Sequence, residues 1–368
     1  MSAYALDKLA DYPDVLQGLR ETGDGQLISV HLMPQNLCNQ RCEFCSYRLP
    51  DNKNSVAFNE GAHLSLDQLE PLLDHFEEMG VRGVEVTGGG EPLAHPEPLK
   101  ILRMLAARGF AIGLVTNGTL HERIKPLPPI VKEHLKWVRV SIDASREETY
   151  RATRKAPKGH FEKAWGCVRW LAAERASLHE DFRLGVGFVL ANQNAKDLYS
   201  FVAQAKAAGA DNVRLSSTFS DQHEDFFKHP DAMRDAVSES LQAVVDYQDE
   251  NFTVHNLIPD RNRDIMHPYQ DYRRCPTKDL LCVVEGEGRV YTCCTFTGSL
   301  SGLYGNYLEH PEGFKGLWEE NATRRREWDS REECRVSCLY RDRNVAMNRL
   351  IDSGETTTRS GVLHREFI

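Results

Sequence analysis

The stretch CNQRCEFC at residues 38–45 places three cysteines at CxxxCxxC spacing, directly after the apolar run LISVHLM at residues 27–33. An apolar run of this kind predicts a β-strand, so the cysteines should lie in the loop that follows it. Three thiolates can hold three corners of a cubane iron-sulfur cluster and leave the fourth iron without a protein ligand. Because such an iron can bind and activate a small molecule, the spacing predicts a reactive cluster rather than an electron store.

A structural zinc site is the alternative for these cysteines, since short cysteine spacings also hold zinc. Structural zinc sites close with four nitrogen or sulfur ligands, and neither a CxxC nor an HxxxH partner follows nearby. The closest downstream histidine is His63, just before an expected helix start. Ligand counting therefore favours the cluster.

A second motif agrees with the cluster. Ser65, with Gln68 three residues later, predicts a helix that begins with a capping box. The sequence VEVTGGGEP at residues 84–92 then predicts a strand that ends in glycines and a carboxylate. Alone, this loop would be an ordinary turn between a strand and a helix. Its position one βα unit after the cysteines makes it specific.

Together these residues resemble the radical S-adenosylmethionine (radical SAM) enzymes, whose signature is CxxxCxφC with an aromatic residue at φ. Phe44 fills that position. The resemblance implies a 4Fe-4S cluster on Cys38, Cys42 and Cys45, with S-adenosylmethionine bound to its open iron and a flavodoxin- or ferredoxin-type reductant. It also implies that a GGEP loop contacts the methionine moiety, and the matching residues are Gly89, Gly90, Glu91 and Pro92.

Strand and helix candidates alternate along the chain, as a parallel α/β sheet requires. The expected strands after the second lie at residues 113–119, 138–143, 184–190 and 212–216, and the expected helices at 96–108, 161–175 and 195–208. Six βα units predict an α/β fold, a partial (β/α)6 TIM barrel, with ligands at the carboxyl ends of the strands.

Four further residues are candidate contacts for S-adenosylmethionine. By resemblance, Ser141 and Asp143 match the position that contacts the ribose, and Asn117 lies in the family's TNG turn. Arg214 could face the adenosyl group or the substrate. Each has a structural alternative: a helix cap for the serine and aspartate, a turn for the asparagine and an ion pair for the arginine.

A second group of cysteines lies near the C-terminus. Its spacing resembles the twitch module, a shortened relative of the SPASM extension, which binds one auxiliary 4Fe-4S cluster in radical SAM enzymes; the implied ligands are Cys275, Cys293, Cys334 and Cys338. Cys294 could replace its neighbour Cys293, and a zinc ribbon is the alternative for the whole set. Cys282 and Cys167 are expected to be small buried apolar residues.

The domain organisation follows from these motifs. We expect an N-terminal extension, a radical SAM barrel, a helical linker, an auxiliary-cluster module and a C-terminal tail, at residues 1–25, 26–225, 226–270, 271–345 and 346–368. We expect this extension to be too short for a separate domain that binds a leader peptide, though not too short for every peptide binder. The polar segment at residues 221–225, with His229, is expected to be an exposed linker rather than a metal site.

Composition bears on the compartment in which the protein works and on the partners that it can bind. Ten cysteines in clusters and no N-terminal signal favour a reducing cytoplasm, and no apolar run is long enough to span a membrane. A net charge of −9 argues against nucleic acid as a partner, because the only basic run is at residues 324–326 and has acidic neighbours.

The resemblance implies that S-adenosylmethionine is cleaved to a 5'-deoxyadenosyl radical, which abstracts hydrogen from the substrate. Similarity to aminocyclitol dehydrogenases with a twitch module implies oxidation, with the auxiliary cluster as electron acceptor. A compact chain, an acidic surface and one auxiliary cluster favour a polar small molecule, such as a sugar, aminocyclitol or nucleoside-like metabolite, as substrate. Epimerisation with Cys282, Cys294 or Cys167 as hydrogen donor, and peptide crosslinking, stay open. So do a zinc-stabilised binding module and an iron-sulfur electron carrier. Asp342, Glu285 and His310 are unranked candidate bases.

Overall fold

The computed structural model describes residue 6 and residues 8–48, 56–218, 230–260, 269–334, 338–353 and 363–367. The segment at 221–229, for which an exposed linker is predicted, lies outside these residues, as do residues 354–362 and 368 of the predicted C-terminal tail. No helix within the described ranges is both long and apolar enough to cross a lipid bilayer.

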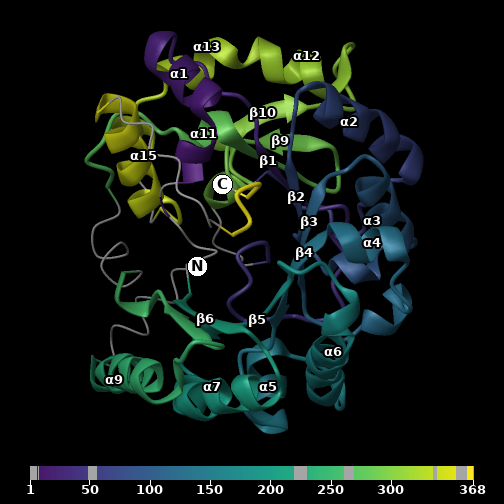
Figure 1. Cartoon of the computed structure of the whole chain (residues 1–368), viewed down its shortest axis with the longest axis vertical. Helices are drawn as coiled ribbons and strands as arrows, with labels where there is room; N and C mark the ends of the chain where they lie inside the picture. The colour runs from purple at the N-terminus through teal and green to yellow at the C-terminus, as the bar shows by residue number, and fades with distance from the viewer. Residues whose placement is uncertain are drawn as a thin grey trace.

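The described strands form one sheet of ten, in the order β10-β9-β8-β1-β2-β3-β4-β5-β6-β7. Neighbours from β1 to β7 are parallel, β8 is parallel to β1, and β9 and β10 are antiparallel. The strands are β1 Ser29–Leu32, β2 Gly83–Val86, β3 Ala111–Thr116, β4 Leu135–Ser141, β5 Arg183–Leu190, β6 Asn212–Ser217, β7 Thr253–Asn256, β8 Leu281–Val284, β9 Arg289–Tyr291 and β10 Leu303–Asn306. The sheet is curved but not closed, which confirms the predicted α/β partial barrel (Figure 1).

Helices between successive strands lie around the outside of the curved sheet (Figure 1). The connecting helices are α2 Leu66–Glu78, α3 Pro98–Ala107, α4 Pro129–His134, α5 Glu147–Arg154, α6 His160–Glu174, α7 Leu198–Ala207 and α9 Pro230–Tyr247. The remaining α-helices are α1 Pro13–Glu21, α11 Thr277–Leu280, α12 Gly313–Glu320, α13 Ala322–Glu327, α14 Ser330–Glu333 and α15 Arg341–Ser353. Short 3-10 helices are η1 Lys8–Asp11, η2 Pro92–Ala94, η3 His121–Ile124, η4 Arg175–Ser177, η5 Ala195–Asp197, η6 Cys294–Phe296 and η7 Leu300–Gly302.

Local sequence signals predict the first six strands and several of the helices between them. The capping box at the start of α2 is confirmed: the Ser65 side chain accepts from the Gln68 amide, and the Gln68 side chain accepts from the Ser65 amide. All six predicted strands are present. The segment predicted as a helical linker also contains a seventh strand, β7, which pairs in parallel with β6. The pattern TVHN is too short to distinguish a strand from a loop by periodicity alone.

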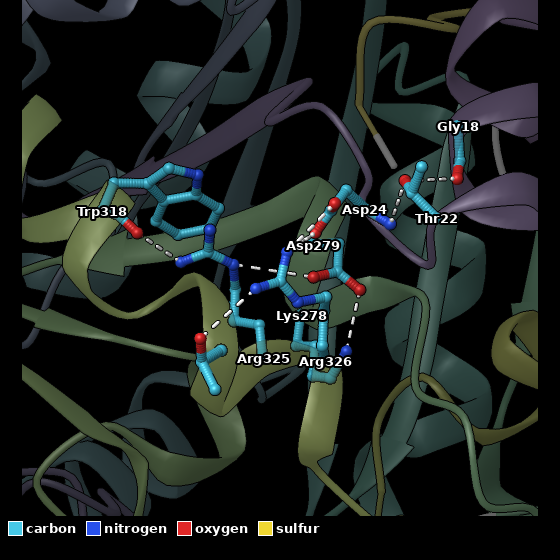
Figure 2. Close-up of polar contacts among 9 residues, drawn as sticks. Gly18, Thr22, Asp24, Lys278, Asp279, Trp318, Arg325 and Arg326 are labelled. Atoms are coloured by element: carbon cyan, nitrogen blue, oxygen red, sulfur yellow. Dashed lines mark hydrogen bonds and ion pairs between the residues drawn. The ribbon is translucent and has the colours of Figure 1, made fainter.

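The region of the second cysteine group joins the same sheet. Strand β8 pairs with β1 on the side opposite β2, so it continues the sheet beyond the first predicted strand. Beside it, the buried carboxylate of Asp279 accepts from Lys278 at 2.8 Å and pairs with Arg325 at 3.6 Å, while the Arg325 guanidinium lies 3.8 Å from the Trp318 ring centroid (Figure 2). Buried charges of this kind are stable only when they are paired. The network therefore fixes helices α11, α12 and α13 to one another.

Candidate functional site

The loop between β1 and α2 carries the first three cysteines and forms one wall of a cavity of about 290 Å³. The other walls are formed by the glycine-rich loop after β2, the carboxyl ends of β3 to β6 and Arg154 of α5. Of the predicted residues, those that line this cavity are Cys38, Cys42, Cys45, Gly89, Gly90, Glu91, Pro92, Asn117 and Ser141. The structure therefore brings together around one cavity all of the site residues predicted from the two motifs.

The glycine-rich loop packs directly on the backbone of the cysteine loop. The amide of Gly90 donates to the Gln35 carbonyl at 3.0 Å, and that of Glu91 donates to the Leu37 carbonyl at 2.9 Å. A Cβ atom on Gly90 would lie 2.2 Å from the Leu37 oxygen and 2.5 Å from that of Asn36. Real Cβ atoms do not approach backbone so closely. Glycine at position 90 is therefore required for the two loops to meet.

The carboxylate of Glu91 is buried and holds the next loop in place. It accepts from the Leu93 amide at 3.0 Å, the Thr116 hydroxyl at 2.5 Å and the Asn117 amide at 2.7 Å. Burial raises the pKa of Glu91, and these three hydrogen bonds oppose the shift. Glu91 thus links the end of β3 to the glycine-rich loop, a structural task that its motif does not reveal.

Asn117 connects the TNG turn to the cysteine loop. Its side-chain amide donates to the Asn39 oxygen at 2.8 Å, while the Asn39 amide donates to the Thr119 hydroxyl at 2.8 Å. The Asn117 oxygen accepts from the Thr119 amide and hydroxyl. This turn therefore supports the loop that presents the cysteines, in addition to lining the cavity.

Asp143 is connected to the cysteine loop only through Arg154, a residue that no sequence motif singled out. It is fully buried, does not line the cavity and forms an ion pair with Arg154, while its other oxygen accepts from the Val189 amide at 2.7 Å. Arg154 lines the cavity and donates to Gln40 in the cysteine loop at 2.9 Å. A ribose contact for Asp143 stays a prediction. No motif marks Arg154, because only the fold brings α5 to the cysteine loop.

The end of α5 also anchors the cysteine loop by its backbone. The carbonyls of Thr153 and Arg154 accept from the amides of Glu43 and Arg41 at 3.1 and 3.0 Å. The last carbonyls of a helix have no partner within the helix, so they are available to a neighbouring loop. This contact holds the peptide units on both sides of Cys42.

Cys38, Cys42 and Cys45 are partly shielded from water. Burial raises the pKa of Cys42 to about 12, and the charge of Arg154 opposes the shift. Arg48 lies near Cys45, with its guanidinium nitrogen 3.9 Å from the sulfur. Cluster ligands are thiolates, and neighbouring cations stabilise thiolates. The donor set and its charged surroundings therefore fit a thiolate-ligated cluster.

A second cavity, of about 420 Å³, lies inside the curved sheet. Its walls include inward-facing side chains of β1, β2, β4 and β6, among them His31, Glu85, Arg139 and Arg214. Arg214 therefore faces this interior space and does not line the cysteine cavity. Tyr47 and Thr87 line both cavities, which makes the two spaces neighbours.

Three of the four predicted ligands in the second cysteine group pack together, whereas the neighbouring Cys294 packs elsewhere. Cys275, Cys293 and Cys334 share an apolar cluster with Phe296 and Trp328. Burial raises the pKa of Cys334 to about 12, and the neighbouring thiols Cys275 and Cys293 add to the shift. No group of three or more His, Cys, Asp or Glu side chains in the described ranges is placed to hold a metal ion, so the ligand sets stay predictions.

Cys294 packs away from that cluster, although it is adjacent to Cys293. It contacts the group formed by Met33, Val283 and Tyr291 and lines the interior cavity. Its sulfur lies 3.4 Å from the Tyr340 hydroxyl. The geometry therefore favours Cys293 over Cys294 as the member of the second cysteine group. Cys282 and Cys167 are buried in the main core, as predicted.

The chain was compared with known proteins. Residues 32–189 match the model of the Radical SAM superfamily. GTP 3',8-cyclase of Xanthomonas axonopodis pv. citri (strain 306) is 36% identical over 117 residues, which are 31% of this chain and 34% of the cyclase. The S-adenosylmethionine-dependent nucleotide dehydratase of Selenomonas ruminantium is 22% identical over 48% of this chain and 61% of its own. AdoMet-dependent heme synthase of Methanosarcina barkeri (strain Fusaro / DSM 804) is 25% identical over 82% of this chain and 84% of the synthase.

Solved structures share the fold at low sequence identity. Streptococcus suis SuiB bound to precursor peptide SuiA superposes with a TM-score of 0.57 and 12% identity, over 97% of this chain and 80% of SuiB. Native anSMEcpe with bound AdoMet gives 0.54 and 15%, over 89% of this chain and 98% of its own. The fold is thus an α/β partial barrel, and the first three cysteines line a cavity in it. Residues 32–189 of this chain form a radical SAM domain, a domain that implies a 4Fe-4S cluster and S-adenosylmethionine.

Proposed function

We propose that the chain cleaves S-adenosylmethionine at the first cysteine group and abstracts hydrogen from a polar small molecule held in the interior cavity. The observation that carries this proposal is the adjacency of the two cavities across Tyr47 and Thr87. A substrate in the interior cavity would lie within reach of a group bound beside the cysteines. Its volume of about 420 Å³ is in the range of sites for small ligands.

Cys38, Cys42 and Cys45 would hold the catalytic 4Fe-4S cluster, and residues 88–92 with Asn117 and Ser141 would surround S-adenosylmethionine. When bound, these groups supply one electron and a 5'-deoxyadenosyl radical. The protein's own contribution is to keep the cysteine loop in place through Arg154 and Asn117 and to orient the substrate. A flavodoxin- or ferredoxin-type protein is the proposed reductant.

Oxidation of the substrate is the outcome we favour, with a second 4Fe-4S cluster on Cys275, Cys293, Cys334 and Cys338 as electron acceptor. Cys338 lines the interior cavity, which supports electron transfer over a short path from a substrate in that cavity. One curated relative, which covers 82% of this chain, is named a heme synthase, and two that match over shorter stretches are named a GTP cyclase and a nucleotide dehydratase. These names support a polar small molecule as substrate.

Epimerisation is the second candidate, because one specific contact favours it. Cys294 lines the interior cavity and lies against the Tyr340 hydroxyl. Its thiol could give a hydrogen atom to the substrate radical, and the resulting thiyl would then take one electron and one proton, the electron coming from the reductant. Replacement of Cys294 by Ala would abolish epimerisation and spare oxidation.

The proposal is tested on protein reconstituted without oxygen. We expect about eight irons per chain in the wild type and about four after Cys38, Cys42 and Cys45 are all changed to Ala. The wild type should form 5'-deoxyadenosine from S-adenosylmethionine when dithionite is added, and the triple variant should not. Zinc in place of iron in the wild type, or equal 5'-deoxyadenosine formation by both proteins, would overturn the proposal.

A further inference from the structure

Arg48 lies on the wall of the cysteine cavity, three residues after Cys45, and its side chain is only 10% exposed. Each nitrogen of its guanidinium group has its own acceptor. Nη1 donates to the Cys45 sulfur at 3.9 Å, and Nη2 donates to the Asn36 carbonyl at 2.9 Å. Nε donates to the Glu60 carboxylate at 3.2 Å. Because a guanidinium group is rigid and planar, these three contacts fix its direction and keep one N–H aimed at the sulfur.

The acceptor carbonyl of Asn36 is itself held in place from two parts of the chain. The Asn36 side-chain amide donates to the Asn59 carbonyl at 3.0 Å and to the buried Glu285 carboxylate at 3.2 Å. Glu285 directly follows β8, so it belongs to the region of the second cysteine group. The Phe58 ring centroid lies 5.8 Å from the Arg48 Cζ. The position of Arg48 therefore depends on packing between both cysteine regions.

The other charged groups on this cavity wall have partners of their own. Of the described residues, the charged ones that line the cavity are Arg48, Glu91 and Arg154. Arg154 pairs with Asp143. Glu91 accepts from two backbone amides and from the Thr116 hydroxyl. Arg48 thus differs from the other two in that its charged group donates to a cysteine sulfur.

Arg48 shares its carboxylate with a second cation. Glu60 also pairs with Arg41 at 2.7 Å, and the side chains of Glu60 and Arg41 are 42% and 53% exposed. Two positive charges and one negative charge leave this group of three with a net charge of +1. The nearby Glu43 pairs with Lys155 at 3.8 Å. The Glu60 carboxylate therefore only partly balances the cation beside the sulfur.

A cation and a hydrogen-bond donor at a ligand sulfur affect how readily a cluster is reduced. Reduction adds one negative charge, so both features stabilise the reduced form more than the oxidised form. Net charge and hydrogen bonds to the sulfurs are among the main determinants of the reduction potential of an iron-sulfur cluster. Arg48 supplies both at Cys45, in a partly buried position where salt screens charges less than at the surface.

We propose that Arg48 is a positioning residue that raises the reduction potential of the first cluster through its contact with Cys45. This inference rests on the proposed function, which assigns that cluster to the first cysteine group. A higher potential makes reduction by the proposed flavodoxin- or ferredoxin-type protein easier. The role belongs to a residue outside the cysteine motif.

The test is a redox titration of the reconstituted full chain, followed by electron paramagnetic resonance. The signal of the first cluster is the one that is absent when all three cysteines of the first group are alanine. Arg48→Gln removes the charge and the fork of donors. We expect the equilibrium constant for one-electron reduction to fall at least about tenfold, which corresponds to a potential lower by about 59 mV.

The matched control is Arg41→Gln. It removes a cation that pairs with the same Glu60 carboxylate but is half exposed to solvent. Exposed charges are screened, so the potential should shift less than half as far as in Arg48→Gln. Iron analysis checks that each variant keeps its clusters. If Arg48→Gln does not, Arg48→Lys takes its place: an ammonium group retains the charge but cannot reproduce the planar fork, so its potential should fall by less.

An unchanged potential in the Arg48 variant that keeps its clusters, or an equal shift in the Arg41 control, would overturn the inference. Weaker binding of S-adenosylmethionine at an unchanged potential would also overturn it and make Arg48 a ligand of that molecule instead. Formation of 5'-deoxyadenosine by the wild type with dithionite is measured in parallel. A lowered potential without cleavage by the wild type would sink only the proposed function, and cleavage with an unchanged potential would sink only this inference. A wild type without iron would overturn both.

Discussion

Arg154 and Asp143 form a buried ion pair in which the arginine lies at the cysteine cavity and the aspartate lies behind it. The Arg154 side chain also donates to the Ile142 carbonyl and to Gln40, so one guanidinium connects β4 to the cysteine loop. Asp143 adopts a left-handed backbone conformation with φ of 61°, and Asn194 donates to its carbonyl. The position of the cysteine loop thus depends on a residue outside both sequence motifs.

Asp143→Ala should lower the free energy of unfolding by about 3–5 kcal/mol, because it leaves the Arg154 charge buried without its partner. Urea unfolding monitored by circular dichroism measures the change. The control is Glu162→Gln, which breaks an exposed ion pair with Arg169 and should cost less than about 1 kcal/mol. Equal losses in the two variants would contradict a stabilising role for the buried pair.

Cys293→Ala and Cys294→Ala form a matched pair of adjacent substitutions. Cys293 packs with Cys275 and Cys334, whereas Cys294 faces the interior cavity. We expect Cys293→Ala to reduce iron from about eight to about four per chain and Cys294→Ala to leave it near eight. Iron and sulfide analysis after anaerobic reconstitution measures the cluster content of each variant. The reverse result would assign Cys294 to the cluster and remove it as a hydrogen donor.

Gly90→Ala should disturb the cysteine loop, since its new methyl group would meet the backbone of Asn36 and Leu37. We expect at least a tenfold loss of affinity for S-adenosylmethionine, equivalent to about 1.4 kcal/mol. Equilibrium dialysis with the reconstituted protein measures it. Gly166→Ala is the control: this glycine lies inside α6, where the nearest atom to a new Cβ would be 3.8 Å away. That change should keep affinity and stabilise the helix by roughly 0.5–1 kcal/mol.

His364 predicts a pH dependence of stability. Burial lowers its pKa from 6.5 to about 4, and its ring nitrogen lies 2.8 Å from the Asp181 carbonyl. The folded state thus prefers the neutral imidazole, so this contribution is complete above pH 6.5 and is lost as the pH falls toward 4. A shift of this size corresponds to about 3 kcal/mol.

The matching variant is His364→Gln, which keeps a donor to the carbonyl and has no titrating group. Between pH 7 and pH 4 the wild type should lose about 3 kcal/mol more unfolding free energy than this variant. Urea unfolding at several pH values provides the comparison. Parallel pH profiles for the two proteins would show that His364 does not titrate between these limits.

Local sequence by itself determined the order of the first six strands and of several helices between them, because alternating burial and helix caps act over a few neighbouring residues. It also determined the two cysteine groups, since ligand spacing is a local property. Ser65 and Gln68 show how completely such a signal can specify a helix start. The six predicted strands and the α/β class followed from the same kind of pattern.

Tertiary structure alone decided the contacts between segments distant in sequence. It placed β8 beside β1, brought Arg154 to the cysteine loop and set Arg139 and Arg214 on either side of the glycines of β5. It also turned Cys293 and Cys294 in different directions, although their sequence environments are nearly identical. These outcomes depend on how side chains pack across the whole sheet, and no spacing within one segment encodes that packing.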